Sequence, residues 1–138
     1  MRRVSLVLVA LALVQCGKPR SSKPEGVVFD PSIESTNKVF KVSAQWLSPP
    51  AAQKNISVRL TVTAVGIEAS SIESVTFDPQ MPSHGHGTFV DDQVVTIESP
   101  QKVKVDGVYF IMGGPWVIHF TAAVNGKTDT ALIPVDVP

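Results

Sequence analysis

The chain has 138 residues, enough for one domain and hardly for two. Charged residues make up 17% and hydrophobic residues 43% of the sequence, which favours a packed core over a disordered chain. The 12 basic and 12 acidic residues balance, so no excess of positive charge points to a nucleic-acid partner.

The N-terminus resembles a bacterial export signal. Two arginines precede an apolar run over residues 4–14, which is too short for a membrane span of about 20 residues and fits the core of a signal peptide. Cys16, the only cysteine, follows where lipoprotein cleavage falls, although Gln15 replaces the small residue that normally precedes a lipidated cysteine. We expect residues 1–15 to be a lipoprotein signal peptide and Cys16 to carry lipid; the alternative is an ordinary secretory signal.

The segment from Cys16 to Gly26 is polar, basic and interrupted by two prolines. This composition is typical of a flexible tether. Together with the lipid, the tether is expected to hold the following domain, residues 27–138, close to a membrane surface. The expected location is therefore the cell envelope, with the domain facing the periplasm or the cell exterior.

Alternation of apolar and polar residues with period two dominates the remainder of the chain, and helical periodicity is nearly absent. The Asp106-Gly107 and Asn125-Gly126 pairs have the composition of tight hairpin turns. The pattern predicts an all-β, immunoglobulin-like antiparallel β-sandwich of about seven or eight strands. The expected strands cover residues 40–46, 58–64, 72–77, 94–97, 102–105, 108–112, 116–124 and 128–137.

The most distinctive stretch between the expected strands is Met81–Thr88, which reads MPSHGHGT. It contains His84 and His86, and the neighbouring glycines permit backbone angles that let the two imidazoles converge. Met81 adds a thioether, and Cu(I) prefers thioether sulfur and accepts imidazole. Met112, just before a Gly-Gly-Pro turn, supplies a fourth ligand if both loops lie at the same end of the sandwich.

Other interpretations of this stretch remain open. A zinc ion would need Asp91 or Asp92 beside the histidines, because the folded part has no cysteine. Alternatively, Pro82 and the glycines only turn the chain, and Met81 only fills the open end of the core. The third histidine, His119, alternates with apolar neighbours and is expected to be an exposed strand residue.

Three short motifs follow one another along the chain: MPSHGHG, DGVYF and MGGPWVI, which begin at Met81, Asp106 and Met112. Their order resembles the YtkA-like family, close to FixH-type domains, in which a Met-Pro-x-Met/His-x-His loop precedes Gly-x-Tyr and then Met-x-Gly-x-Trp. The resemblance covers residues 40–137, with His84 in place of the second loop methionine. It implies a small secreted or membrane-tethered β-sandwich, and members are often discussed beside copper-handling proteins.

No pattern typical of catalysis is present, because the chain has neither a Gly-x-Ser-x-Gly elbow nor a His-Glu-x-x-His motif. Trp116 is expected to anchor the core, or with Tyr109 to shield a metal from water. We predict a membrane-tethered, non-enzymatic domain that binds copper for capture or delivery. The alternative is an interaction or structural module that contacts another envelope protein and holds no metal.

Overall fold

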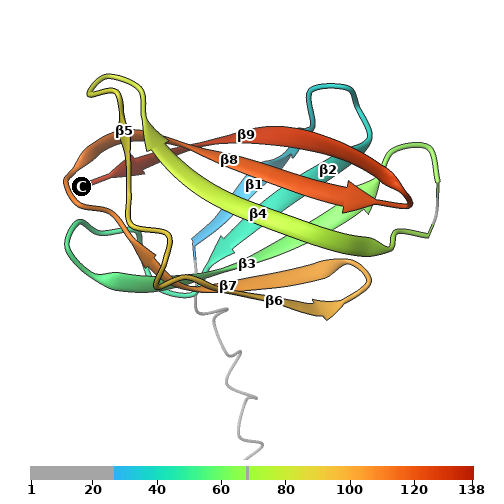
Figure 1. Ribbon diagram of the computed structural model, residues 1–138, viewed down its shortest axis with the longest axis horizontal. Helices are drawn as coiled ribbons and strands as arrows, with labels where there is room; N and C mark the ends of the chain where they lie inside the picture. The colour runs from blue at the N-terminus through green and yellow to red at the C-terminus, as the bar shows by residue number, and fades with distance from the viewer. Residues whose placement is uncertain (1–26, 68) are drawn as a thin grey trace, which may run out of the picture.

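The computed structural model describes residues 27–138 apart from residue 68. Over these residues the chain forms two antiparallel sheets and no helix, so the prediction of an all-β sandwich is confirmed (Figure 1). None of the described residues belongs to a helix able to cross a membrane. The expected signal peptide, the lipidation at Cys16 and the tether to Gly26 lie outside the described residues.

The two sheets lie face to face and contain nine strands among the described residues (Figure 1). The five-stranded sheet has the order β1 (Val27–Glu34), β2 (Phe40–Trp46), β3 (Asn55–Ala64), β7 (Lys102–Tyr109) and β6 (Val94–Ser99). The four-stranded sheet has the order β5 (His86–Gly87), β4 (Ile72–Met81), β8 (Gly114–Val124) and β9 (Lys127–Val137).

One core fills the space between the sheets, because every second residue of most strands points inward. Phe40 of β2 and Phe120 of β8 meet edge to face across the two layers, with ring centroids 5.9 Å apart. Where the structure describes the side chains, the buried apolar residues all lie between Phe40 and Val137. Residues 26–138 therefore carry a complete core and are expected to fold without the N-terminal segment.

The predicted turn at Asn125-Gly126 is confirmed, whereas the one predicted at Asp106-Gly107 is wrong. Asn125 and Gly126 join β8 to β9 with φ angles of 51° and 74°, as a two-residue hairpin requires. β7 instead continues through Asp106 and Gly107, which together oppose Ser57 of β3 as a β-bulge. The sequence does not separate the two cases, because Gly107 also has a positive φ of 72°.

Replacing Gly107 by alanine is expected to lower the free energy of unfolding by about 1–3 kcal/mol. A Cβ at this position would collide with the backbone carbonyl oxygen of Asp92, and φ lies in the left-handed region. Gly126→Ala is the matched control, since Gly126 has a φ of 74° but no atom within 4 Å of the added Cβ. Urea unfolding should show the larger loss for Gly107→Ala; equal losses would contradict a steric role for the bulge.

Asp129 of β9 is a buried carboxylate that holds the β1–β2 turn from the end of the sandwich opposite the MPSHGHGT loop. Its Oδ2 accepts a hydrogen bond from the Asn37 backbone N–H at 2.8 Å, and its Oδ1 accepts one from Thr130 at 2.9 Å. Burial raises the pKa of Asp129, but hydrogen bonds from Ser35 and from the backbone of Thr130, Asn37 and Val39 outweigh burial and lower the pKa to about 2.

Because its folded pKa of about 2 lies below the ordinary value of 3.8, Asp129 stabilises the fold fully above pH 3.8 and loses this effect as the pH falls toward 2. Asp129→Asn is expected to lower the free energy of unfolding by about 2 kcal/mol at pH 7. Urea titrations at pH 7 and at pH 2.5 should show the difference from the wild type shrinking at the lower pH. A constant difference would contradict this role.

Candidate metal site

The MPSHGHGT stretch forms a tight β-hairpin that extends β4. Met81, the last residue of β4, pairs with His86 of β5. The backbone N–H groups of His84 and Gly85 both donate to the Met81 carbonyl oxygen at 3.0 Å, and Gly85 has the positive φ of 67° that such a turn needs. The stretch is thus a turn by its backbone, and this turn determines where the two imidazoles lie.

The rings of His84 and His86 lie side by side, with their centroids 5.6 Å apart. A metal about 2 Å from one nitrogen of each ring lies about 3 Å from each centroid, so rings up to about 6 Å apart can share one ion. His86 Nδ1 is 3.1 Å from the Gly87 carbonyl oxygen; donation to this oxygen would leave the Nε2 lone pair available as a ligand. His84 is exposed and His86 is half-buried.

The hairpin and the turn at Met112 lie at the same end of the sandwich. The Met81 methyl carbon is so close to Gly114 that a Cβ there would lie 2.7 Å from it. The His86 ring packs against Trp116 with a centroid distance of 5.9 Å, and Trp116 Nε1 donates to the Met112 carbonyl oxygen at 3.0 Å. The sequence made Met112 a candidate ligand only if its turn and the histidine loop lie at the same end of the sandwich. In the structure they do.

The two predicted methionine ligands differ in burial. Met81 is only 2% exposed and belongs to the core, while Met112 is half-buried and packs against it. This burial agrees with the interpretation that Met81 fills the open end of the core. A methionine that binds copper from the core side of a site would be buried in the same way. The burial of Met81 therefore does not distinguish a core residue from a copper ligand.

Carboxylates do not complete the site. Asp91 and Asp92 are exposed, and across residues 27–138, residue 68 excepted, no three side chains of His, Cys, Asp or Glu are placed to share a metal ion. The other side chains that the sequence predicted as ligands are the thioethers of Met81 and Met112. This donor chemistry fits Cu(I) better than zinc.

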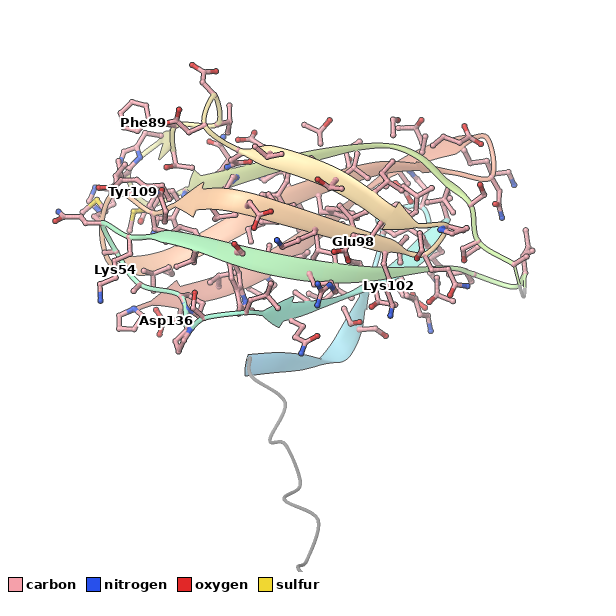
Figure 2. The ribbon with its side chains drawn as sticks, turned by 90° about the horizontal axis from the view of Figure 1, so that it is seen from below. Lys54, Phe89, Glu98, Lys102, Tyr109 and Asp136 are labelled. Carbon is pink, nitrogen blue, oxygen red and sulfur yellow. The ribbon has the colours of Figure 1, made fainter. Side chains whose placement is uncertain are left out.

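Tyr109 and His119 have other neighbours than the two imidazoles. Tyr109 lines a surface cavity of about 290 Å³ with Asn55, Phe89 and Asp92, and its carbonyl oxygen accepts a hydrogen bond from Thr88 Oγ1. Figure 2 shows Tyr109 and Phe89 at the same end of the sandwich. His119 is exposed on the outer face of β8, as expected, and it pairs in register with Asp78 of β4.

A row of aromatic side chains supports the hairpin from inside the core. Phe110 lies between Trp116 and Trp46, with centroid distances of 5.2 Å and 6.0 Å, and the other side of Trp116 contacts the His86 ring. No pattern in the sequence predicted this position for Phe110. The motif DGVYF contains the residue, but its place depends on how the chain crosses from one sheet to the other.

Comparison of the chain with models of known families, with curated protein sequences and with solved structures finds no match. The resemblance of the three motifs to the YtkA-like family stays a prediction from the sequence. The assignment of the candidate site therefore depends on the geometry of the hairpin and on the chemistry of its side chains.

Proposed function

We propose that this domain binds Cu(I) through His84, His86, Met81 and Met112. The observation that carries the proposal is the position of the two imidazoles, whose ring centroids lie 5.6 Å apart on a hydrogen-bonded hairpin. The second observation is that this hairpin contacts the start of β8 immediately after the Met112 turn. Two nitrogens and two thioether sulfurs form a donor set suited to Cu(I).

The arrangement suits transient holding of the ion and not catalysis, and we propose a non-enzymatic role. The exposed His84 is the ligand that a donor or acceptor molecule can reach and replace. The buried Met81 and the aromatic face of Trp116 keep water from the inner side of the ion, which favours the reduced state of copper. These features support capture or delivery of copper in the cell envelope.

We also propose that the domain is a lipid-anchored, YtkA-like module facing the periplasm or the cell exterior. Support comes from the leader, the position of Cys16 and the tether in the sequence. An immunoglobulin-like arrangement is supported by the orders β2-β3-β7-β6 and β4-β8-β9. They correspond to the A-B-E-D and C-F-G sheets of constant-type immunoglobulin domains.

A competition titration with a chromogenic Cu(I) chelator under reducing conditions tests the proposed function on residues 26–138. The expected result is tight binding of one Cu(I) per chain. Binding that is absent, or that follows no defined stoichiometry, would contradict the proposal. Zn(II), titrated against a chromogenic zinc chelator, should bind more weakly, because among the described residues the hairpin places two imidazoles together without a third His, Cys, Asp or Glu side chain beside them.

Replacing Met81 by leucine is expected to lower the Cu(I) affinity at least tenfold while changing stability by less than about 1.5 kcal/mol, because the two side chains have similar volumes. Met112→Leu is expected to behave in the same way. The chelator titration and urea unfolding measure the two effects separately. If Met81 serves only to fill the core, the affinity will be unchanged, which would remove it from the ligand set.

The alternative function is an interaction or structural module that contacts another envelope protein without a metal. The observation that favours it is the exposure of apolar residues beyond the hairpin, with Phe89 68% and Val90 43% exposed. In that case crosslinking in cells recovers a partner whether or not a copper chelator is present. Loss of the crosslink upon chelation would count against this alternative.

A further inference from the structure

Strand β6 is an exception among the edges of the two sheets. β1 and β9 each contain a proline, Pro31 and Pro134, and β5 has only two residues. Proline and very short strands protect sheet edges from pairing with other chains. β6 has six residues and contains neither proline nor lysine, so its outer backbone groups are open to another strand.

The side chains of β6 are exposed on both faces of the sheet. Val95 and Ile97 pair in register with the core residues Val105 and Val103 of β7, yet they are 38% and 41% exposed. Both side chains point to the same side as the core, but they lie beyond the area that the opposite sheet covers. Val94, on the outer face, is 58% exposed. A strand placed against this edge would cover apolar surface that the fold itself leaves in water.

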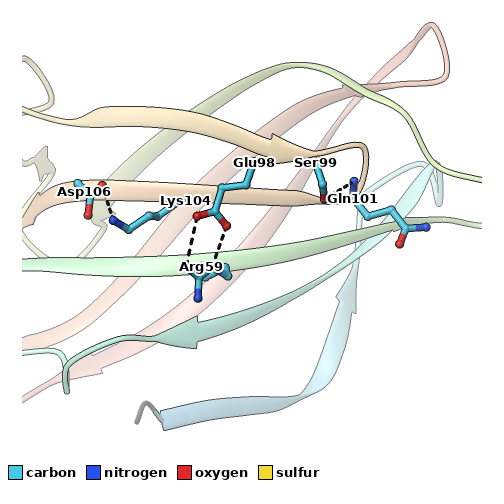
Figure 3. Close-up of polar contacts among 6 residues, drawn as sticks. All are labelled: Arg59, Glu98, Ser99, Gln101, Lys104 and Asp106. Atoms are coloured by element: carbon cyan, nitrogen blue, oxygen red, sulfur yellow. Dashed lines mark hydrogen bonds and ion pairs between the residues drawn. The ribbon is translucent and has the colours of Figure 1, made fainter. Parts of the chain in front are cut away.

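Four charged side chains on the outer face beside β6 are already paired within the chain. Arg59 of β3 donates to both carboxylate oxygens of Glu98 on β6, at 2.8 Å and 3.2 Å, and Lys104 contacts Asp106 on β7 at 2.9 Å (Figure 3). These contacts hold the polar side chains over their own sheet. They leave the edge itself without a free charge between Val94 and Ile97.

We propose that β6 pairs antiparallel with β6 of a second copy of this chain, about a two-fold axis at Thr96, to form a continuous sheet through both copies. This inference does not depend on the metal site. In this register Val95 of each copy opposes Ile97 of the other on the core face, and the two Thr96 residues oppose each other on the outer face. The apolar positions are therefore self-complementary.

Charge placement favours the same register. The Glu98 residues of the two copies oppose Val94 and lie about 13 Å apart along the strands, so like charges do not meet. The acidic pair Asp91 and Asp92, just before β6, approaches the β6–β7 turn of the other copy, where Lys102 is exposed. By symmetry this attraction occurs twice.

Self-pairing of β6 also closes the assembly. In a two-fold dimer each copy uses its β6 edge, so no unpaired β6 edge remains for a third copy. If β6 paired with a different edge of the next copy, the contact could repeat and generate an open filament. The regular ladder is short, because a bulge between Ile97 and Ser99 ends it. The dimer is therefore expected to be weak in solution and to be favoured where a membrane anchor concentrates the chains.

Cysteine crosslinking tests the register. Residues 26–138 contain no cysteine, so Thr96→Cys introduces a single thiol that faces its own counterpart, about 5 Å away between Cβ atoms. Val94→Cys is the matched control, since its counterpart lies about 13 Å away along the strand. Mild oxidation at equal concentration should yield at least tenfold more disulfide dimer for Thr96→Cys. Equal yields would overturn the proposed register.

Sedimentation velocity over a concentration series up to the millimolar range tests the dimer itself. Val95→Lys is expected to weaken self-association at least tenfold, whereas Leu132→Lys, at a 49% exposed apolar position on β9, is expected to leave it unchanged. Far-ultraviolet circular dichroism checks that both variants are folded. A wild type that stays monomeric at every concentration, or equal effects of the two substitutions, would overturn the proposal.

Discussion

Replacing His84 and His86 together by alanine is expected to lower the affinity for Cu(I) roughly a hundredfold or more, because it removes both nitrogen ligands and leaves only thioethers. Stability should change little, since His84 is exposed and His86 is half-buried. The chelator titration measures the affinity, and urea unfolding checks the fold.

His119→Ala is the matched control for this double variant. It also removes an imidazole, but from the exposed outer face of β8, so its affinity for Cu(I) should equal that of the wild type. An unchanged affinity in the double variant would contradict the site, and so would an equal loss in His119→Ala. The single variants should each lose less than the double variant, with His86→Ala losing more, because its ring is held between Trp116 and the Gly87 carbonyl.

Replacing Trp116 by alanine is expected to lower the free energy of unfolding by about 3–5 kcal/mol, as is typical for a large aromatic side chain removed from a core. Trp116 is only 1% exposed and packs between Phe110 and His86. Its loss should also loosen the hairpin and the Met112 turn, because Nε1 donates to the Met112 carbonyl oxygen. Thermal and urea unfolding measure the stability.

Two tryptophan-to-phenylalanine variants separate packing from hydrogen bonding. Trp116→Phe removes the hydrogen bond to Met112, whereas Trp46, equally buried, has no acceptor for its Nε1 among the described residues. Trp116→Phe is therefore expected to cost about 1 kcal/mol more than Trp46→Phe. Equal losses would mean that the indole N–H does not position the Met112 turn. A lower Cu(I) affinity in Trp116→Phe alone would connect this turn to the metal site.

Much of the fold was predictable from local patterns. The alternation in residues 40–46 and 128–137 identified strands of which one face is buried, and the observed β2 and β9 show this burial residue by residue. Asn125-Gly126 identified its hairpin because the two positive φ angles of that turn are accessible to few residue pairs. These signals depend only on neighbours in the sequence.

Features that depend on pairing between distant strands were not predictable in this way. The Asp106-Gly107 bulge arises from the register of β7 against β3, and the short β5 exists only because His86 returns to pair with Met81. The sequence of β6 showed apolar residues over only four positions, 94–97. The exposure of these residues follows from the place of β6 at an edge of the sheet. No local pattern carries that information.

The candidate site also has features that the sequence predicts and features that only the fold determines. The side chains with metal-binding chemistry were evident in the sequence, because two histidines and a methionine lie within six residues. Whether Met112 lies at the same end depended on the register of β8 against β4, which brings Gly114 against Met81. The support from Phe110 and Trp116 beneath His86 was also beyond local reasoning, since it crosses between the sheets.

X-ray absorption at the copper edge, on residues 26–138 loaded with one equivalent of Cu(I), tests the ligand set most directly. The expected spectrum contains nitrogen scatterers at about 2.0 Å with the outer-shell features of imidazole, together with sulfur at about 2.3 Å. His84→Ala/His86→Ala should lose the imidazole features, and Met81→Leu should lose sulfur amplitude. A wild-type spectrum with oxygen and nitrogen alone would contradict a site built from the hairpin and the thioethers.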